Sequence, residues 1–188
     1  MMLKSYAVAL AASVIAAGCG SVAPTGMLAA ARLDPLTTPP GKISVAVRVP
    51  TQVRLAEGDA GLYLAFAPDD PQQAAPIATT VPLRVLADTS GPRAATSEDV
   101  VYVFGFSPDA AAEIAATQAE ITALREGGVM GTGTLSVAIT GGCLTAPLPE
   151  GALPVATWLR TDPANGFVPL TRSTDMRDML TGTRLPPC

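Results

Sequence analysis

The chain has 188 residues, of which 48% are hydrophobic and 15% are charged, and its formal net charge is −4. This acidic balance excludes the basic footprint that nucleic acids and anionic bilayers require, and the low share of charged residues argues against a wholly disordered chain. The sequence has no histidine, which excludes Ser-His-Asp and Cys-His catalysis and every metal site that needs an imidazole.

The N-terminus has the parts of an export signal. Lys4 supplies one positive side chain, and residues 5–17 form an uncharged stretch rich in Ala, Val, Ile and Leu. This stretch suits a signal peptide and is shorter than the roughly 20 residues of a membrane-spanning helix.

A cysteine follows this stretch directly. Residues 16–19, Ala-Ala-Gly-Cys, resemble the lipobox of bacterial lipoproteins, with alanine at the first position where leucine is commoner. The resemblance covers residues 1–19 only. It implies cleavage after Gly18, a diacylglycerol on the Cys19 thiol and acylation of the new amine, and two or more chains anchor a protein stably. The alternative is an ordinary secretory signal cleaved near Ala17.

The lipobox also implies a location. Gly20 follows the cysteine in place of an aspartate, a pattern that goes with transfer to the outer membrane in enterobacterial lipoproteins. We therefore expect a cell-envelope protein anchored to the membrane through lipid on Cys19, preferably on the outer membrane facing the periplasm.

Two cysteines remain after Cys19 is assigned to lipid. In an oxidising compartment Cys143 and Cys188 most simply pair, and the bond would close a loop of about 45 residues. The chain-entropy estimate for such a loop is about 4 kcal/mol. A redox pair is the alternative, but no Cys-x-x-Cys spacing supports it.

The remaining chain divides into a tether and a domain. Residues 19–41 contain four prolines among small polar residues and lack a sustained period, which predicts a flexible tether. Residues 42–188 have the size of one domain.

The domain opens with strand signals. Apolar residues alternate over 43–49 and again over 62–66, with turn chemistry at 57–59, which predicts a hairpin. Alternation returns over 81–85, where Pro82 indicates an edge or irregular strand.

A buried strand and a helix come next. Residues 100–106 are apolar on both faces, as in a central strand. Ser107 and Pro108 suit the N-cap and first position of an amphipathic helix over about 108–126. Alternation over 135–139 predicts another strand, so that residues 100–140 read as a possible crossover unit.

The C-terminal part predicts a second hairpin over 155–170, with its turn at 162–166, and a short helix near 174–180. The fold expected from these elements is mainly β (α+β), a β-sandwich or strongly curved sheet with the helix packed on it. The alternative is a closed β-barrel.

Three carboxylate pairs are candidates for acid–base work or for a hard cation: Asp69 with Asp70, Glu98 with Asp99, and Asp175 with Asp178. Each falls in an expected loop or helix end, where capping and solvation are the commoner roles. We therefore assign no catalytic residue, metal ligand or cofactor.

Other candidate binding groups are weaker still. The glycine-rich residues 127–133 follow a helix, the reverse of the order in a phosphate loop, and predict a connection. Two side-chain sets have both a binding and a structural interpretation. The aromatic set, a possible sugar or peptide platform, comprises Trp158 with Tyr63, Tyr102 or Phe167. The cationic set, a possible anion-binding face, comprises Arg160, Arg172 and Arg177.

Three classes of function are compatible with these features. The first is a non-enzymatic envelope lipoprotein, an assembly, structural or partner-binding accessory with a protein partner in the envelope. The alternatives are a periplasmic module that binds a small ligand or glycan and, less favoured, a histidine-free hydrolase with two facing carboxylates.

Overall fold

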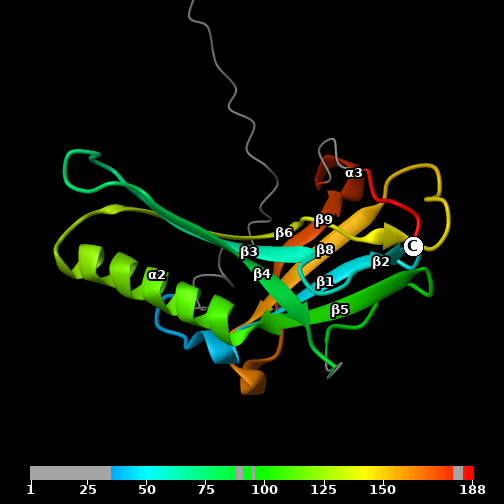
Figure 1. Cartoon of the computed structure of the whole chain (residues 1–188), viewed down its shortest axis with the longest axis horizontal. Coiled ribbons are helices and arrows are strands. Elements are labelled where there is room, and N and C mark those ends of the chain that lie inside the picture. Colours follow the sequence, from blue (N-terminus) through cyan, green and yellow to red (C-terminus); the bar gives the residue numbers. More distant parts are fainter. Residues whose placement is uncertain (1–34, 88–90, 95, 180–183) are drawn as a thin grey trace, which may run out of the picture.

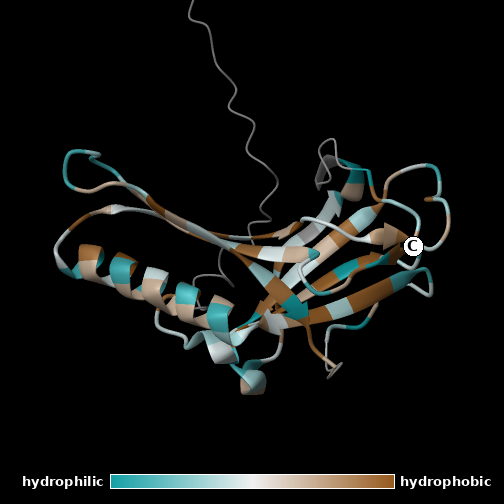
Figure 2. Ribbon diagram, viewed as in Figure 1, coloured by the Kyte–Doolittle hydropathy of each residue, from teal (hydrophilic) through white to brown (hydrophobic). Residues whose placement is uncertain are grey.

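The structure is a computed structural model, and it describes residues 35–87, 91–94, 96–179 and 184–188. The expected signal peptide, Cys19 and most of the expected tether lie outside these residues. Figure 1 shows the arrangement of the elements, and Figure 2 shows their hydropathy.

The described elements are, in chain order, η1 (Pro40–Lys42), β1 (Ser44–Pro50), β2 (Val53–Arg54), β3 (Ala60–Pro68), β4 (Ile77–Val85), β5 (Asp99–Phe106), α2 (Pro108–Glu126), β6 (Gly131–Ile139), β7 (Cys143–Leu144), β8 (Pro154–Arg160), η2 (Pro163–Asn165), β9 (Val168–Asp175) and α3 (Met176–Met179).

Seven strands form one antiparallel sheet in the order β6-β3-β4-β5-β1-β8-β9, while β2 and β7 pair separately. The large sheet curls, so that Leu135 of β6 and Leu170 of β9 line one pocket although they lie on its two edge strands. The prediction of a mainly β fold with one packed helix is confirmed. The architecture is a strongly curved sheet, nearly closed into a barrel, with a small second sheet beside it.

The core lies inside the curl. On β1, Val45, Val47 and Val49 are buried at 1% exposure or less, and they face Phe104, Tyr102 and Val100 of β5 in the ladder. β5 is the middle strand of the sheet, in agreement with its apolar sequence. Figure 2 shows apolar residues concentrated along these strands.

Helix α2 forms where its sequence signals lie. The Ser107 hydroxyl accepts the amide of Ala110 at 3.2 Å, Pro108 occupies the first turn, and Gly127 ends the helix. One face is buried, through Ala110, Ile114, Thr117, Gln118 and Ile121. This face packs mainly on β4, and Figure 1 shows the helix beside the β3–β4 hairpin. The predicted amphipathic helix is confirmed.

The crossover interpretation of residues 100–140 is wrong. β3 and β4 lie between β5 and β6, and successive antiparallel pairings make β6 antiparallel to β5. Figure 1 gives the reason: α2 continues in the direction in which β5 ends, and β6 then runs back along β3.

The first predicted hairpin is also wrong. β1 pairs with β5 and β8, whereas β3 pairs with β4 and β6. Residues 53–54 leave the large sheet and pair with β7. Alternation identified these strands correctly, but it contains no information on which strand lies beside which.

The second hairpin is confirmed, because β8 and β9 pair around η2. The short C-terminal helix begins at Met176 rather than 174, since β9 extends to Asp175. Pro82 pairs opposite Gly61 of β3, one residue before pairing of β4 with β5 begins at Leu83. The N-terminal half of β4 therefore has one strand neighbour, as an edge position would.

The described end of the expected tether packs on the domain. Gln118 of α2 is 6% exposed and donates to the carbonyl of Thr38 at 3.0 Å, while Leu36 packs against the core. The packed part of the chain thus includes residues 35–41, N-terminal to the boundary expected at residue 42.

Candidate functional site

The strongest cluster of recognition side chains lies on the half-buried face of β1 and β8 that points away from the inside of the curl, where Ser44, Ala46 and Ala156 are buried. In their ladder Ala46 lies opposite Trp158, Arg48 opposite Ala156, and Ser44 opposite Arg160. Because side chains alternate along a strand, Arg48, Trp158 and Arg160 project away from the buried valines of β1. We call these three residues the arginine–tryptophan face.

Both guanidinium groups of this face rest near aromatic rings. Cζ of Arg48 lies 5.8 Å from the ring centroid of Trp158, and Cζ of Arg160 lies 4.6 Å from that of Phe167. Arg160 also donates through Nη2 to the Ser44 hydroxyl at 3.3 Å. Such contacts orient a cation without neutralising its charge.

The two arginines have no acidic partner within the described residues. The ion pair found there joins Arg177 to Asp175, at 3.9 Å. The Nε atoms of Arg48 and Arg160 are buried and make no hydrogen bond in the described part of the chain. Atoms this buried cannot be reached by a partner, so an anionic group would bind through the other N–H groups of the two guanidinium groups, which have no carboxylate partner among the described residues.

The structure divides both predicted sets of binding side chains. Arg160 lies by the ring of Phe167, whereas Trp158 lies by Arg48. Tyr63 lies on β3, and Tyr102 donates its hydroxyl to the carbonyl of Val53 at 3.3 Å on the inner side.

Arg177 is also separate from the arginine–tryptophan face. It donates through Nη2 to the carbonyl of Pro149 at 3.0 Å and through Nη1 to that of Gly151. The side chain of Arg172 lies outside the described residues.

Sequence reasoning missed Arg48. Its alternation with Val47 and Val49 placed it on the polar face of a strand, and that was the available signal. Its position beside Trp158 depends on the pairing of β1 with β8, which joins segments more than a hundred residues apart.

The carboxylate candidates take part in local turns. Asp70 accepts from the amide of Gln72 at 2.9 Å, and Asp99 accepts from the amide and hydroxyl of Thr96, both at 3.1 Å. Glu98 and Asp99 do line a pocket of about 240 Å³.

The other carboxylates show no metal-binding arrangement. Asp175 pairs with Arg177, and the side chain of Asp178 lies outside the described residues. Among the side chains that the structure describes, no three acidic or cysteine groups gather as metal ligands would.

The glycine-rich residues form a connection, as expected. Gly127 and Gly128 end α2, with Gly128 at a φ of 83°, and Gly131 opens β6. The amides of this loop therefore do not lie at a helix N-terminus, where phosphate is bound.

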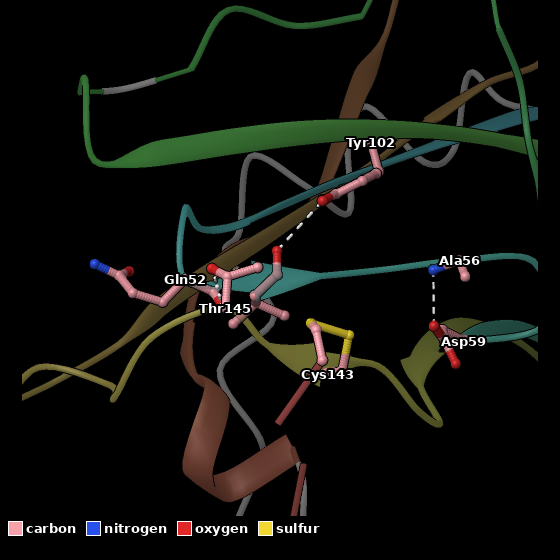
Figure 3. Close-up of a disulfide and its surroundings, with 8 residues drawn as sticks. Gln52, Ala56, Asp59, Tyr102, Cys143 and Thr145 are labelled. Atoms are coloured by element: carbon pink, nitrogen blue, oxygen red, sulfur yellow. Dashed lines mark hydrogen bonds between the residues drawn. A yellow bond between two sulfur atoms is a disulfide. The ribbon is translucent and has the colours of Figure 1, made fainter. Parts of the chain in front are cut away.

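Cys143 and Cys188 form a disulfide, with their Cα atoms 4.9 Å apart (Figure 3). The C-terminal residues lie beside β7: the amide of Leu144 donates to the carbonyl of Pro186 at 2.8 Å, and that of Cys188 donates to the carbonyl of Leu144 at 2.9 Å. On the other side of β7, Thr145 donates its amide to the carbonyl of Gln52 at 2.8 Å. The disulfide thus fastens the C-terminus to the small sheet.

In the parts of the chain that the structure covers, no helix combines the length and apolar character needed to cross a membrane. Comparison with known proteins found no matching protein-family model, curated protein or solved structure.

Proposed function

We propose that the protein is a lipid-anchored, non-enzymatic accessory of the cell envelope. On this proposal Cys19 carries the lipid, and the domain binds an acidic protein partner through the arginine–tryptophan face. The lipobox resemblance of residues 16–19 supports the anchor. One observation carries the partner: Arg48 and Arg160 lie on one face of β1 and β8, and neither guanidinium group has a carboxylate partner among the described residues.

The chemistry of the face favours a protein partner. Tryptophan and arginine are the side chains that most often dominate binding energy at protein interfaces. A guanidinium group matches a carboxylate in shape and bonds it through two parallel hydrogen bonds. Since the chain is acidic overall, two arginines without an acidic neighbour select a surface that supplies aspartate or glutamate.

The other two functions have less support. A glycan platform needs an open aromatic face, and Arg48 lies over the Trp158 ring. A hydrolase needs two carboxylates on opposite sides of a substrate, and the bonds of Asp70 and Asp99 are to neighbouring residues of their own turns.

The proposal is tested by crosslinking in intact cells followed by mass spectrometry. We expect a reproducible envelope protein that is lost in the double variant Arg48→Glu and Arg160→Glu. The matched control is Arg54→Glu, which reverses an exposed arginine on β2. Replacing an interfacial acid of the captured protein by arginine should restore the contact with the double variant. Capture that survives the double charge reversal would rule the face out as the binding surface.

A further inference from the structure

The outer edge of β6 has an unusual composition for an edge strand. β6 pairs with β3 along its whole length, and no strand among the described residues pairs with its other side. Residues 131–139, Gly-Thr-Gly-Thr-Leu-Ser-Val-Ala-Ile, include no charged residue and no proline. Proteins usually protect such edges with lysine, proline or a bulge, because unpaired amides and carbonyls recruit further strands. The β6 edge has none of these protections in its sequence or its register with β3.

Two pockets follow this edge. The first, of about 300 Å³, is lined by Leu64 of β3, residues 133–135 of β6 and Leu170 of β9. We call it the seam pocket, because it lies between the two edge strands of the curled sheet; Pro35 and Leu36 of the N-terminal segment also line it. The second, of about 420 Å³, lies between the C-terminal end of α2 and Gly131 of β6, and Leu36 borders both pockets.

Two local features open the seam pocket. Leu170 has no partner on β8, because Thr157 pairs with Thr171 and Trp158 pairs with Pro169, so that β9 is irregular there. Gly133 faces inward, opposite the buried Phe66 in the ladder, and a Cβ added to it would meet nothing closer than 4.0 Å. The space beside the β6 backbone is therefore wide enough for a side chain that this chain does not itself supply.

We propose that the free edge of β6 binds an extended, uncharged segment of a partner polypeptide by strand addition, with an apolar side chain of that segment in the seam pocket. In this mode backbone hydrogen bonds supply affinity, and pockets for alternate side chains supply specificity. Side chains on one face of a strand recur every two residues, about 7 Å apart. Of the β6 positions that line the pockets, Gly131, Gly133 and Leu135 follow this period, and Thr134 lies between two of them.

The geometry favours a single segment over a second copy of this chain. A second copy would bring its own curled sheet to the edge, whereas the seam pocket is bounded by β6 on one side and by β9 on the other. One extended strand fits such a position more readily than the edge of another sheet. The site uses β6 and not the arginine–tryptophan face on β1 and β8, so either proposal can fail while the other stands.

The experiment uses the ¹⁵N-labelled protein with a panel of uncharged heptapeptides that alternate threonine with Val, Leu, Ile or Phe. Each peptide is paired with a copy that is N-methylated at alternate residues. At about 1 mM peptide, near the weak limit of specific binding, we expect shifted resonances and slower amide exchange for residues 131–139. N-methylation should weaken binding about tenfold, because it removes backbone donors.

Two variants separate binding from folding. Gly133→Val fills the seam pocket with a side chain that suits a strand, and we expect binding about tenfold weaker with an unchanged melting temperature. Thr132→Val places the same side chain at the neighbouring position, on the opposite, exposed face of β6, and should bind like the parent protein.

Several results would overturn the inference. They are the absence of shifts with every peptide, equal binding by the N-methylated peptides, and competition for the seam pocket by dodecanoate while the β6 amides remain unaffected. Protection of the β6 amides that depends on protein concentration, with dimers in sedimentation equilibrium, would assign the edge to self-association instead.

Discussion

Arg48 and Trp158 lie on neighbouring strands, two pairs apart in the ladder, with the guanidinium carbon 5.8 Å from the centroid of the indole ring. Trp158 is the single tryptophan of the chain, so its fluorescence reports on the arginine–tryptophan face alone. Removing the cation therefore has a direct optical signature.

Arg48→Ala should shift the emission of Trp158 to longer wavelength, because the arginine side chain shields the ring from water. The free energy of unfolding should fall by about 1 kcal/mol, the order of magnitude of a half-buried cation–π contact. Arg54→Ala, on β2, should leave the emission unchanged. An identical spectrum for Arg48→Ala would show that the contact does not shield the ring in solution.

Removal of the disulfide should destabilise the domain strongly. The bond joins residues 45 apart, for which the loop-closure estimate is about 4 kcal/mol. The double variant Cys143→Ser and Cys188→Ser should lower the free energy of unfolding by up to about that amount, measured by urea denaturation. The parent protein in reductant should lose a similar amount, while the double variant should not respond to reductant. Two alkylatable thiols in protein isolated natively from the envelope would contradict the pairing.

Removing the N-cap of α2 should destabilise the domain less than removing the disulfide does. The hydroxyl of Ser107 accepts the amide of Ala110, and its replacement by alanine typically costs about 1 kcal/mol. Ser107→Asp should retain the stability, since aspartate caps as well and its charge suits the helix N-terminus. Thermal unfolding of Ser107→Ala, Ser107→Asp and the parent compares the three. Equal melting temperatures would mean that packing on β4 alone holds the helix start.

Gln118 should connect the N-terminal segment to the domain. Its Nε2 donates to the carbonyl of Thr38 from a nearly buried position on α2. Gln118→Leu keeps most of the volume and removes the donor, so residues 35–41 should become more accessible to protease, while global stability falls by about 1 kcal/mol. Limited proteolysis with N-terminal sequencing of the products measures the change. The control is Glu120→Leu, on an exposed position of the same helix.

The accuracy of the sequence predictions depends on how local their signals are. α2 was predictable from Ser107, Pro108 and its buried stripe, and β5 from its apolar run, because each signal lies within the element. The partners of β1 were not predictable, since the ladders to β5 and β8 join distant segments. For the same reason the candidate site was only partly predictable. Trp158 and Arg160 lie close together in one predicted strand, whereas Arg48 lies near them only because β1 pairs with β8.

The direction in which α2 leaves β5 was also not predictable from the sequence. A strand, a helix and a strand usually make a parallel unit, in which the helix returns across the sheet. Here the long β3–β4 hairpin offers its own apolar surface, and α2 buries Ile114 and Ile121 there instead. The pattern of buried residues on the helix is the same in both arrangements, so the amphipathic sequence does not distinguish them.

The proposed lipid anchor on Cys19 can be tested by changing that residue. The packed domain includes residues from 35 onward, so a change at Cys19 should leave its fold intact while altering its location. Cys19→Ala should block lipid attachment and the processing that follows it. Because an uncleaved signal can itself hold a protein in the membrane, a second variant should carry Cys19→Ala behind a standard cleavable secretory signal. We expect that variant in the soluble periplasmic fraction, with the melting temperature of the parent domain, and the parent in the membrane fraction with labelled palmitate. If the Cys19→Ala variant with the secretory signal still sediments with membranes, the protein is attached through the domain or its partner, and the thiol of Cys19 is not the anchor.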